Sequence, residues 1–131
     1  MIADDVEELV VAYLGQSFAN VGVDMPNDAP TPYYLVCRMS GADDMITDCA
    51  TVQVDAFANT RTAASDAARA LHNVMNPWVL TPKLGFDLST GRGFIDHVCT
   101  LETPRWCDYE NPNLERYCGR YRIELRMNKS S

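Results

Sequence analysis

The segment from residue 52 to residue 71, VQVDAFANTRTAASDAARAL, constrains the fold most, because two different periodicities meet in it. In its first part apolar and polar residues alternate, which is typical of a strand with one covered face. Val52, Val54 and Ala56 lie on one face, and Asp55 lies on the opposite, polar face. A carboxylate near a strand end can have a catalytic, a binding or a purely structural role. The rest of the sequence is needed to distinguish these roles.

At Thr60 the alternation gives way to an alanine-rich pattern with helical spacing. We predict a helix over residues 60–75, capped by Asn59 or Thr60. Asn76-Pro77 should end it, because the residue before a proline disfavours helical geometry. Its small side chains allow close packing on a sheet. The apolar face consists of Ala64, Ala67, Ala68, Leu71, Val74 and Met75.

The same periodicities predict another helix and, including the strand that contains Val52, four strands in all. Residues 4–14 place apolar side chains on one helical face, with acidic residues in the first turns and Gly15 as a stop. Strands are predicted at 33–39, 49–57, 94–106 and 117–127. In the last strand one face carries Tyr117, Tyr121, Ile123, Leu125 and Met127, and the other carries Arg120, Arg122, Glu124 and Arg126.

The fold class predicted from these elements is α+β. Their order is α-β-β-α-β-β, which favours a mainly antiparallel sheet with two helices packed on one face. The length of 131 residues is that of one ordinary domain, so we expect a single domain over 1–131. Connecting loops are expected at residues 20–32, 40–48, 81–93 and 107–116.

Charge and composition exclude several classes of protein. The formal net charge is −7, which disfavours bulk attraction to nucleic acid or to anionic membranes. No apolar run approaches the ~18 residues of a membrane span, and the acidic N-terminus does not resemble a secretory signal. We therefore expect a soluble protein made in the cytoplasm, whose five cysteines, an odd number without CxxC spacing, are reduced.

No motif for a catalytic nucleophile, a nucleotide or a phosphate is present. The sharpest enzyme hypothesis is a metal-dependent nuclease in which Asp55 and Glu124 hold Mg²⁺, but solvated strand faces commonly carry such acids. His72 is expected to be an exposed helix residue. We expect a protein that is not an enzyme and that needs no cofactor.

Zinc binding and DNA binding are two alternative functions that the sequence leaves open. Suitable zinc ligand types occur near the end of the chain, but their spacing matches no compact zinc module. They are His97, Cys99, Cys107 and Cys118. Two of them, His97 and Cys99, should share a half-buried strand face with Ile95. The basic row of the last strand is interrupted by Glu124, which favours a solvated or subunit-facing surface over a nucleic-acid groove.

Protein interfaces are the remaining place where function can reside. Loops and the polar sheet face expose charged and aromatic groups of the kind that engage partners. A ring of identical subunits requires two different patches that match, and faces of opposite charge suit that requirement. The candidate interface residues are Asp43, Asp44, Met45, Gln53, Asp55, Arg92, Trp106, Tyr109, Arg116, Arg122 and Glu124.

Three segments resemble the tail terminator family of long-tailed bacteriophages, especially those of actinobacteria. They are DVEELVVAYLG near the start, VQVDAFANTRTAASDAARALHNVM in the middle and YENPNLERYCGRYRIELRM at the end. The combination, with the length and the acidic balance, carries the likeness. The sequence departs from the family pattern at Cys118-Gly119 inside the last strand and in its five cysteines.

The resemblance implies a structural protein of the virion neck, assembled in the host cytoplasm. Such a protein caps the tail tube as a ring, generally a hexamer, ends tail polymerisation and offers a surface to the head-completion proteins. DNA would pass through the ring without specific binding, because fixed acids repel phosphates, and no membrane is involved. Another head-tail connector or tail-completion subunit is the structural alternative.

Overall fold

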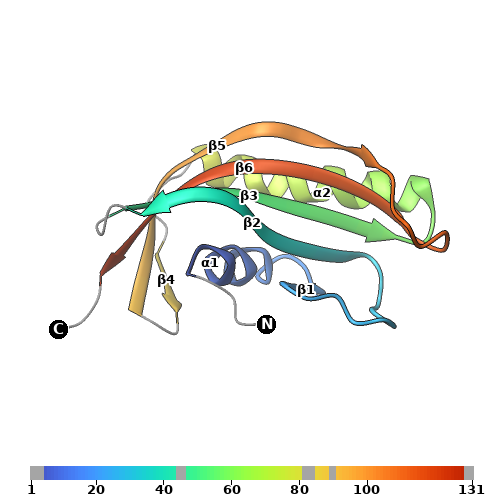
Figure 1. Cartoon of the computed structure of the whole chain (residues 1–131), viewed down its shortest axis with the longest axis horizontal. Coiled ribbons are helices and arrows are strands. Elements are labelled where there is room, and N and C mark those ends of the chain that lie inside the picture. The colour runs from blue at the N-terminus through green and yellow to red at the C-terminus, as the bar shows by residue number, and fades with distance from the viewer. Residues whose placement is uncertain (1–4, 44–46, 81–84, 89–90, 129–131) are drawn as a thin grey trace.

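The computed structural model describes residues 5–43, 47–80, 85–88 and 91–128, and its six strands form one curved sheet (Figure 1). The strand order across the sheet is β1-β2-β3-β6-β5-β4. Neighbouring strands are antiparallel except for the parallel pair β1 and β2, and the sheet curls into a half-barrel. The elements are α1 (Asp5–Leu14), β1 (Val21–Gly22), β2 (Tyr33–Asp43), β3 (Thr47–Ala58), α2 (Arg61–Leu80), β4 (Gly85–Leu88), β5 (Gly91–Cys107) and β6 (Glu115–Asn128).

The α+β class is confirmed, but the structure contains two short strands, β1 and β4, that the predicted order of elements does not include. β1 lies in the segment 20–32 and β4 in the segment 81–93, both of which the sequence predicts to be loops. β1 pairs only with Tyr34 and Leu35 of β2, and β4 pairs with the first residues of β5. Elements of two and four residues are too short to show a periodicity. The sheet is therefore mixed and wider than predicted.

The other two predicted loops are shorter than expected. β2 continues to Asp43 and β3 begins at Thr47, so the segment 40–48 contributes mostly to strands. Its small residues Gly41 and Ala42 have little strand preference, but the ladder with β3 continues through them. The last loop narrows from 107–116 to residues 108–114.

Helix α2 does not end at Asn76-Pro77 as predicted but continues to Leu80. At its start the prediction is confirmed, because the hydroxyl of Thr60 accepts the amide of Ala63 at 3.1 Å. Pro77 lacks the amide that would bond the carbonyl four residues earlier. Close to this gap the Tyr13 hydroxyl of α1 donates to the carbonyl of Val74 at 2.6 Å. This tertiary contact supports the helix where local preference disfavours it.

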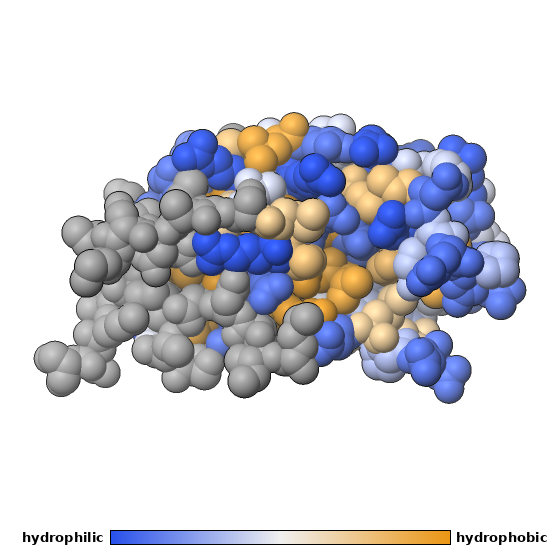
Figure 2. All heavy atoms as spheres, in the orientation of Figure 1, coloured by the Kyte–Doolittle hydropathy of each residue, from blue (hydrophilic) through white to orange (hydrophobic). Residues whose placement is uncertain are grey.

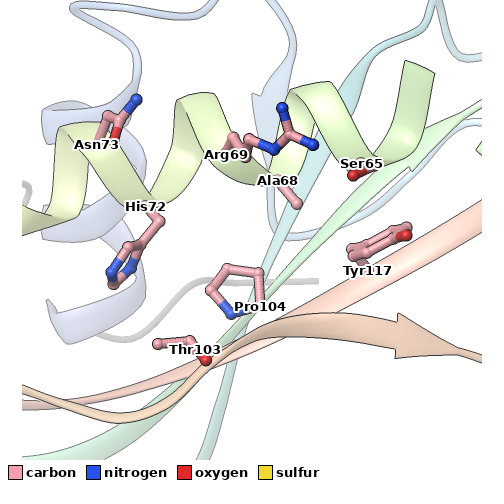
Figure 3. A pocket seen from close by; sticks show the side chains of 8 residues that line it. All are labelled: Ser65, Ala68, Arg69, His72, Asn73, Thr103, Pro104 and Tyr117. Atoms are coloured by element: carbon pink, nitrogen blue, oxygen red, sulfur yellow. The ribbon is translucent and has the colours of Figure 1, made fainter. Parts of the chain in front are cut away.

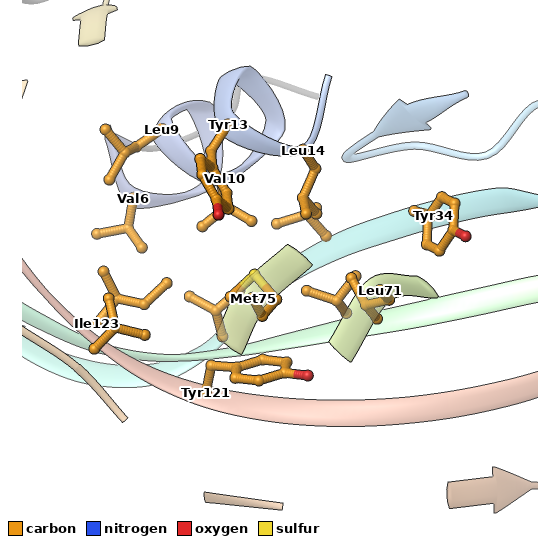
Figure 4. Close-up of a cluster of buried hydrophobic side chains, with 14 of the residues drawn as sticks. Val6, Leu9, Val10, Tyr13, Leu14, Tyr34, Leu71, Met75, Tyr121 and Ile123 are labelled. Atoms are coloured by element: carbon orange, nitrogen blue, oxygen red, sulfur yellow. The ribbon is translucent and has the colours of Figure 1, made fainter. Parts of the chain in front are cut away.

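Both helices pack against the same face of the sheet, which we call the inner face (Figure 4). α1 directs its apolar side chains toward α2 and the central strands, as the sequence predicts. The aromatic ring of Phe18, just after α1, stacks on Tyr34 with centroids 4.2 Å apart. The fully buried core residues with the largest volumes include Leu9, Leu14, Tyr34, Leu71, Met75, Ile95, Tyr121, Ile123 and Leu125. Within the described chain, neither helix is long and apolar enough to cross a membrane.

β5 is irregular, with three register shifts against β6, between Ile95 and His97, Thr100 and Glu102, and Glu102 and Arg105. Each shift adds residues on β5 that have no partner of their own on β6. Ile95 is buried before the first shift and Val98 is buried after it. His97, between them, is exposed and pairs with Glu124. The prediction that His97 and Cys99 share the face of Ile95 is therefore wrong, because a bulge reverses the alternation.

The third irregularity explains the unusual Cys118-Gly119 step in β6. A Cβ atom at Gly119 would lie 3.0 Å from Cγ of Pro104, so the proline ring occupies the space where a side chain would stand. The pairing of β6 with β3 remains unbroken through this point, from Thr47 to Ala58. The predicted alternation of β6 is thus confirmed, with Tyr121, Ile123 and Leu125 buried.

Candidate functional site

The outer face of the sheet, which points away from both helices, holds Gln53, Asp55, Arg116, Arg122 and Glu124 of the sequence-predicted site residues. Their grouping follows from register, because Asp55 pairs with Cys118 and Gln53 pairs with Arg120. Side chains that pair across neighbouring strands lie on the same face. The outer face of β3 and β6 comprises Gln53, Asp55, Phe57, Arg116, Cys118, Arg120, Arg122, Glu124 and Arg126.

A buried polar cluster lies at the centre of this face. Asp55, expected on a solvated polar surface, is only 6% exposed. One of its oxygens accepts the Gln53 side-chain amide at 2.8 Å, and the other lies 3.8 Å from Nη1 of Arg116. The Gln53 carbonyl oxygen in turn accepts Nε of Arg120 at 3.1 Å. A buried carboxylate with these partners is satisfied by the protein itself.

Arg116 links this cluster to the loop at 108–114. Its Nη2 donates to the carbonyl of Asp108 at 2.8 Å, and its guanidinium lies 5.5 Å from the ring centroid of Tyr109. Tyr109 packs edge-on against Phe57, with centroids 4.9 Å apart. Arg116 Nε is buried and has no hydrogen-bond partner among the described residues. The predicted residues Gln53, Asp55, Tyr109 and Arg116 thus meet in one cluster that ties a loop to the sheet.

The thiol of Cys118, beside this cluster, is not activated as a nucleophile. Burial, together with hydrogen bonds to Cys107 and Asp55, raises the pKa of the Cys118 thiol and keeps it protonated. Cys99, Cys107 and Cys118 form no disulfide. Across the described residues, no three His, Cys, Asp or Glu side chains gather in a group that could hold a metal ion.

The two acids of the nuclease hypothesis are not brought together. Asp55 pairs with Cys118, whereas Glu124 lies six residues further along β6. At about 3.3 Å per strand residue, their positions along β6 are about 20 Å apart. Glu124 instead forms a long ion pair with exposed Arg122, at 3.9 Å. One Mg²⁺ ion cannot bridge the two carboxylates in this fold.

The remaining predicted residues are scattered. Trp106 donates to Glu115 at 2.9 Å on the inner side of the sheet, under the guanidinium of Arg61 at 4.7 Å. Arg92 pairs with Asp87 at 2.8 Å at the β4–β5 hairpin. Asp43 ends β2, and Asp44 and Met45 lie outside the described residues.

A groove between α2 and the bulged part of β5 was not predicted (Figure 3). It has a volume of about 290 Å³ and is lined by Arg69 and His72 of α2, Pro104 of β5 and Tyr117 of β6, among others. His72 is half-buried and not fully exposed as predicted, and its Nδ1 lies 3.2 Å from the buried Tyr121 hydroxyl. The groove depends on the bulges of β5, which leave no periodic signal in the sequence.

Comparisons with known proteins give a likeness of fold. No protein-family model matches the chain, and no curated protein matches it significantly. Among solved structures, the chain is similar to a chain of the virion of a native gene transfer agent particle, with a TM-score of 0.53 and 18% sequence identity. The match covers 95% of this chain and 87% of that one. At this identity the likeness establishes a shared fold.

Proposed function

We propose that the protein is a structural component of a phage-like virion, and that within it the protein serves as the tail terminator. The observation that supports this most is the fold match over nearly the whole chain to a chain of a gene transfer agent virion. The three sequence segments that resemble tail terminators support the same role. In this role the protein caps the finished tail tube as a ring and presents the surface that the head side joins.

The chemistry of the outer face supports a role in binding and not in catalysis. Its central carboxylate, Asp55, is satisfied by Gln53 and Arg116, and the acids and arginines around it form ion pairs. A satisfied polar cluster holds a surface rigid, and a rigid surface loses little entropy on association. The net charge of −7 also repels DNA phosphates, which suits a ring through which DNA passes.

The test is whether the purified protein stops the growth of tail tubes. Tail tube protein of the same virus is polymerised with and without this chain, and tube lengths are measured by electron microscopy. Light scattering after size-exclusion chromatography measures the assembly that this chain forms. We expect a ring, either free or on the tube end, and tubes that stop elongating once they are capped.

Two results would contradict this function. Tubes that elongate normally while the chain binds a head-side protein would make it a connector or tail-completion subunit. Cutting of plasmid DNA with Mg²⁺, abolished by Asp55→Ala but not by Asp87→Ala, would make it a nuclease.

A further inference from the structure

An apolar hollow lies beside the first half of α2, on the side of the helix away from the groove of Figure 3. Its volume is about 530 Å³. Three alanines of α2 line it, Ala63, Ala67 and Ala70, and the rings of Phe18 and Tyr34 lie opposite them. Alanine side chains are too short to fill the space, so apolar surface stays uncovered. We call this the alanine hollow.

Two contacts of Tyr34 hold the alanine hollow in shape. The Tyr34 hydroxyl donates to the carbonyl of Ala67 at 3.0 Å, and the Phe18 ring stacks on the Tyr34 ring. An apolar pocket that is formed in advance binds an apolar side chain without first having to order its walls. The hollow therefore fits a protruding hydrophobic side chain.

Leu101 is such a side chain on the same molecule. It is 53% exposed, and Met39 at 48% is the other large hydrophobic residue this exposed among the described residues. Leu101 stands at the second bulge of β5, between Thr100, which pairs with Tyr121 on the inner face, and Glu102. By alternation it points to the outer face. Figure 2 shows hydrophobic atoms exposed over β5, at the upper edge of that view.

Leu101 and the alanine hollow cannot meet within one molecule, because one lies on the outer face and the other on the helix side. Their surroundings differ in charge. Asp66, with a 67% exposed side chain, lines the hollow and lies 3.9 Å from Arg69. Leu101 lies beside Arg120 and Arg122 of β6 and next to the Glu102–Arg105 ion pair. Two different, complementary patches on one chain are what a head-to-tail contact between identical copies needs.

We propose that Leu101 of one copy inserts into the alanine hollow of a second copy, with Asp66 of the second copy facing the β6 arginines of the first. This inference rests on the proposed ring and names the contact between neighbouring subunits. Repeated from copy to copy, one such contact generates a ring when the rotation closes.

The experiment compares Leu101→Asp, Ala63→Trp and a matched control, Met39→Asp, by light scattering after size-exclusion chromatography, alone and with tail tube protein. Ala63 is exposed at the mouth of the hollow, so a tryptophan there can block it without entering the core. Circular dichroism verifies that each variant folds. We expect Leu101→Asp and Ala63→Trp to weaken self-association about tenfold or more, and Met39→Asp to leave it unchanged.

Mixing the two impaired variants tests the direction of the contact. The Ala63→Trp copy still offers Leu101, and the Leu101→Asp copy still offers an open hollow. Together they should form a pair but no ring, whereas each alone stays monomeric. A mixture that forms no pair overturns the head-to-tail arrangement.

Other outcomes separate this inference from the proposed function. A ring that survives both substitutions overturns the inference but leaves the proposed function standing. Loss of tube binding without loss of self-association also overturns it, since the occupant would then be the tube protein. A wild-type chain that forms no ring, alone or with tube protein, contradicts the proposed function itself.

Discussion

The inner and outer faces of the sheet are built from the same strands but are stabilised by different interactions. On the inner face, side chains such as Val52, Val54 and Ile123 are fully buried against the two helices. On the outer face no helix covers the strands, yet Asp55 and Cys118 are also buried. Asp55 contacts Gln53 and Arg116, and Arg116 bonds the loop at 108–114. The stability of an apolar core depends on filling its volume, so removing buried atoms is costly. The stability of a polar cluster depends on every hydrogen-bonding partner being present. This difference can be tested by substitution.

The largest effect is expected on the inner face, from Leu71→Ala. Leu71 is fully buried in the middle of α2, so its truncation leaves a cavity and should lower the free energy of unfolding by about 2–5 kcal/mol. Leu101→Ala on the outer face removes the same atoms from an exposed site and should change it by less than about 0.5 kcal/mol. Urea unfolding of the two variants measures both values. Similar losses would contradict the distinction between the faces.

The next effect concerns the polar cluster of the outer face. Asp55→Ala removes the acceptor for Gln53 and the partner of Arg116, and should cost about 1.5–3 kcal/mol of unfolding free energy. Asp87→Ala is the control, because that carboxylate is 89% exposed and should cost little. If Asp55→Ala unfolds at the same urea concentration as wild type, the cluster does not stabilise the sheet.

A smaller effect, which depends on pH, is expected for Tyr34. Burial raises the pKa of Tyr34 to about 12, above its ordinary value of 10.0. The neutral hydroxyl therefore favours the folded state, with a contribution that is complete below pH 10 and is lost as the pH rises toward 12. Tyr34→Phe should cost about 1 kcal/mol at pH 7, through the lost bond to Ala67, and should make stability less sensitive to alkali. Urea unfolding at pH 7 and at several values above pH 10 tests this, and an unchanged alkaline slope would contradict it.

The smallest effect is expected at the exposed rim of the outer face. Arg122→Ala breaks an ion pair with Glu124 whose atoms are 3.9 Å apart, with the arginine side chain 52% exposed. Its effect on unfolding free energy should stay below about 0.5 kcal/mol and shrink further in salt. A loss comparable to that of Asp55→Ala would mean that the rim and the buried cluster act as one network.

The sequence predicts membership of the two faces well wherever a strand is regular. The alternation in β3 and β6 assigns Val52, Asp55 and Ile123 to the faces that they occupy. It could not predict that Asp55 is buried, because its partner Arg116, which also bonds the loop at 108–114, comes from a strand far later in the chain. Nor could it predict the face of His97, because a bulge is a property of the pairing between β5 and β6 and not of either strand alone.

The candidate site was predicted in part for the same reason. Gln53, Asp55 and Arg116 lie on regular strands, so their meeting follows from strand pairing once the register is known. The groove beside His72 arises where α2 lies across the bulged part of β5, and the alanine hollow arises where α2 lies beside the segment that leads into β2. Small side chains at helical spacing indicate close packing, but they do not reveal where that packing leaves a space.

The bulges of β5 also limit how copies of this chain can join. Beyond Phe94, β5 pairs only with β6 among the described strands, which leaves a long edge where a further strand could add. The register shifts and Pro104, which has no amide to donate, interrupt the regular row of donors and acceptors that such an addition needs. An edge interrupted in this way disfavours growth of one continuous sheet from copy to copy. In the proposed ring, subunits would then join through contacts between side chains, which are used up when the ring closes.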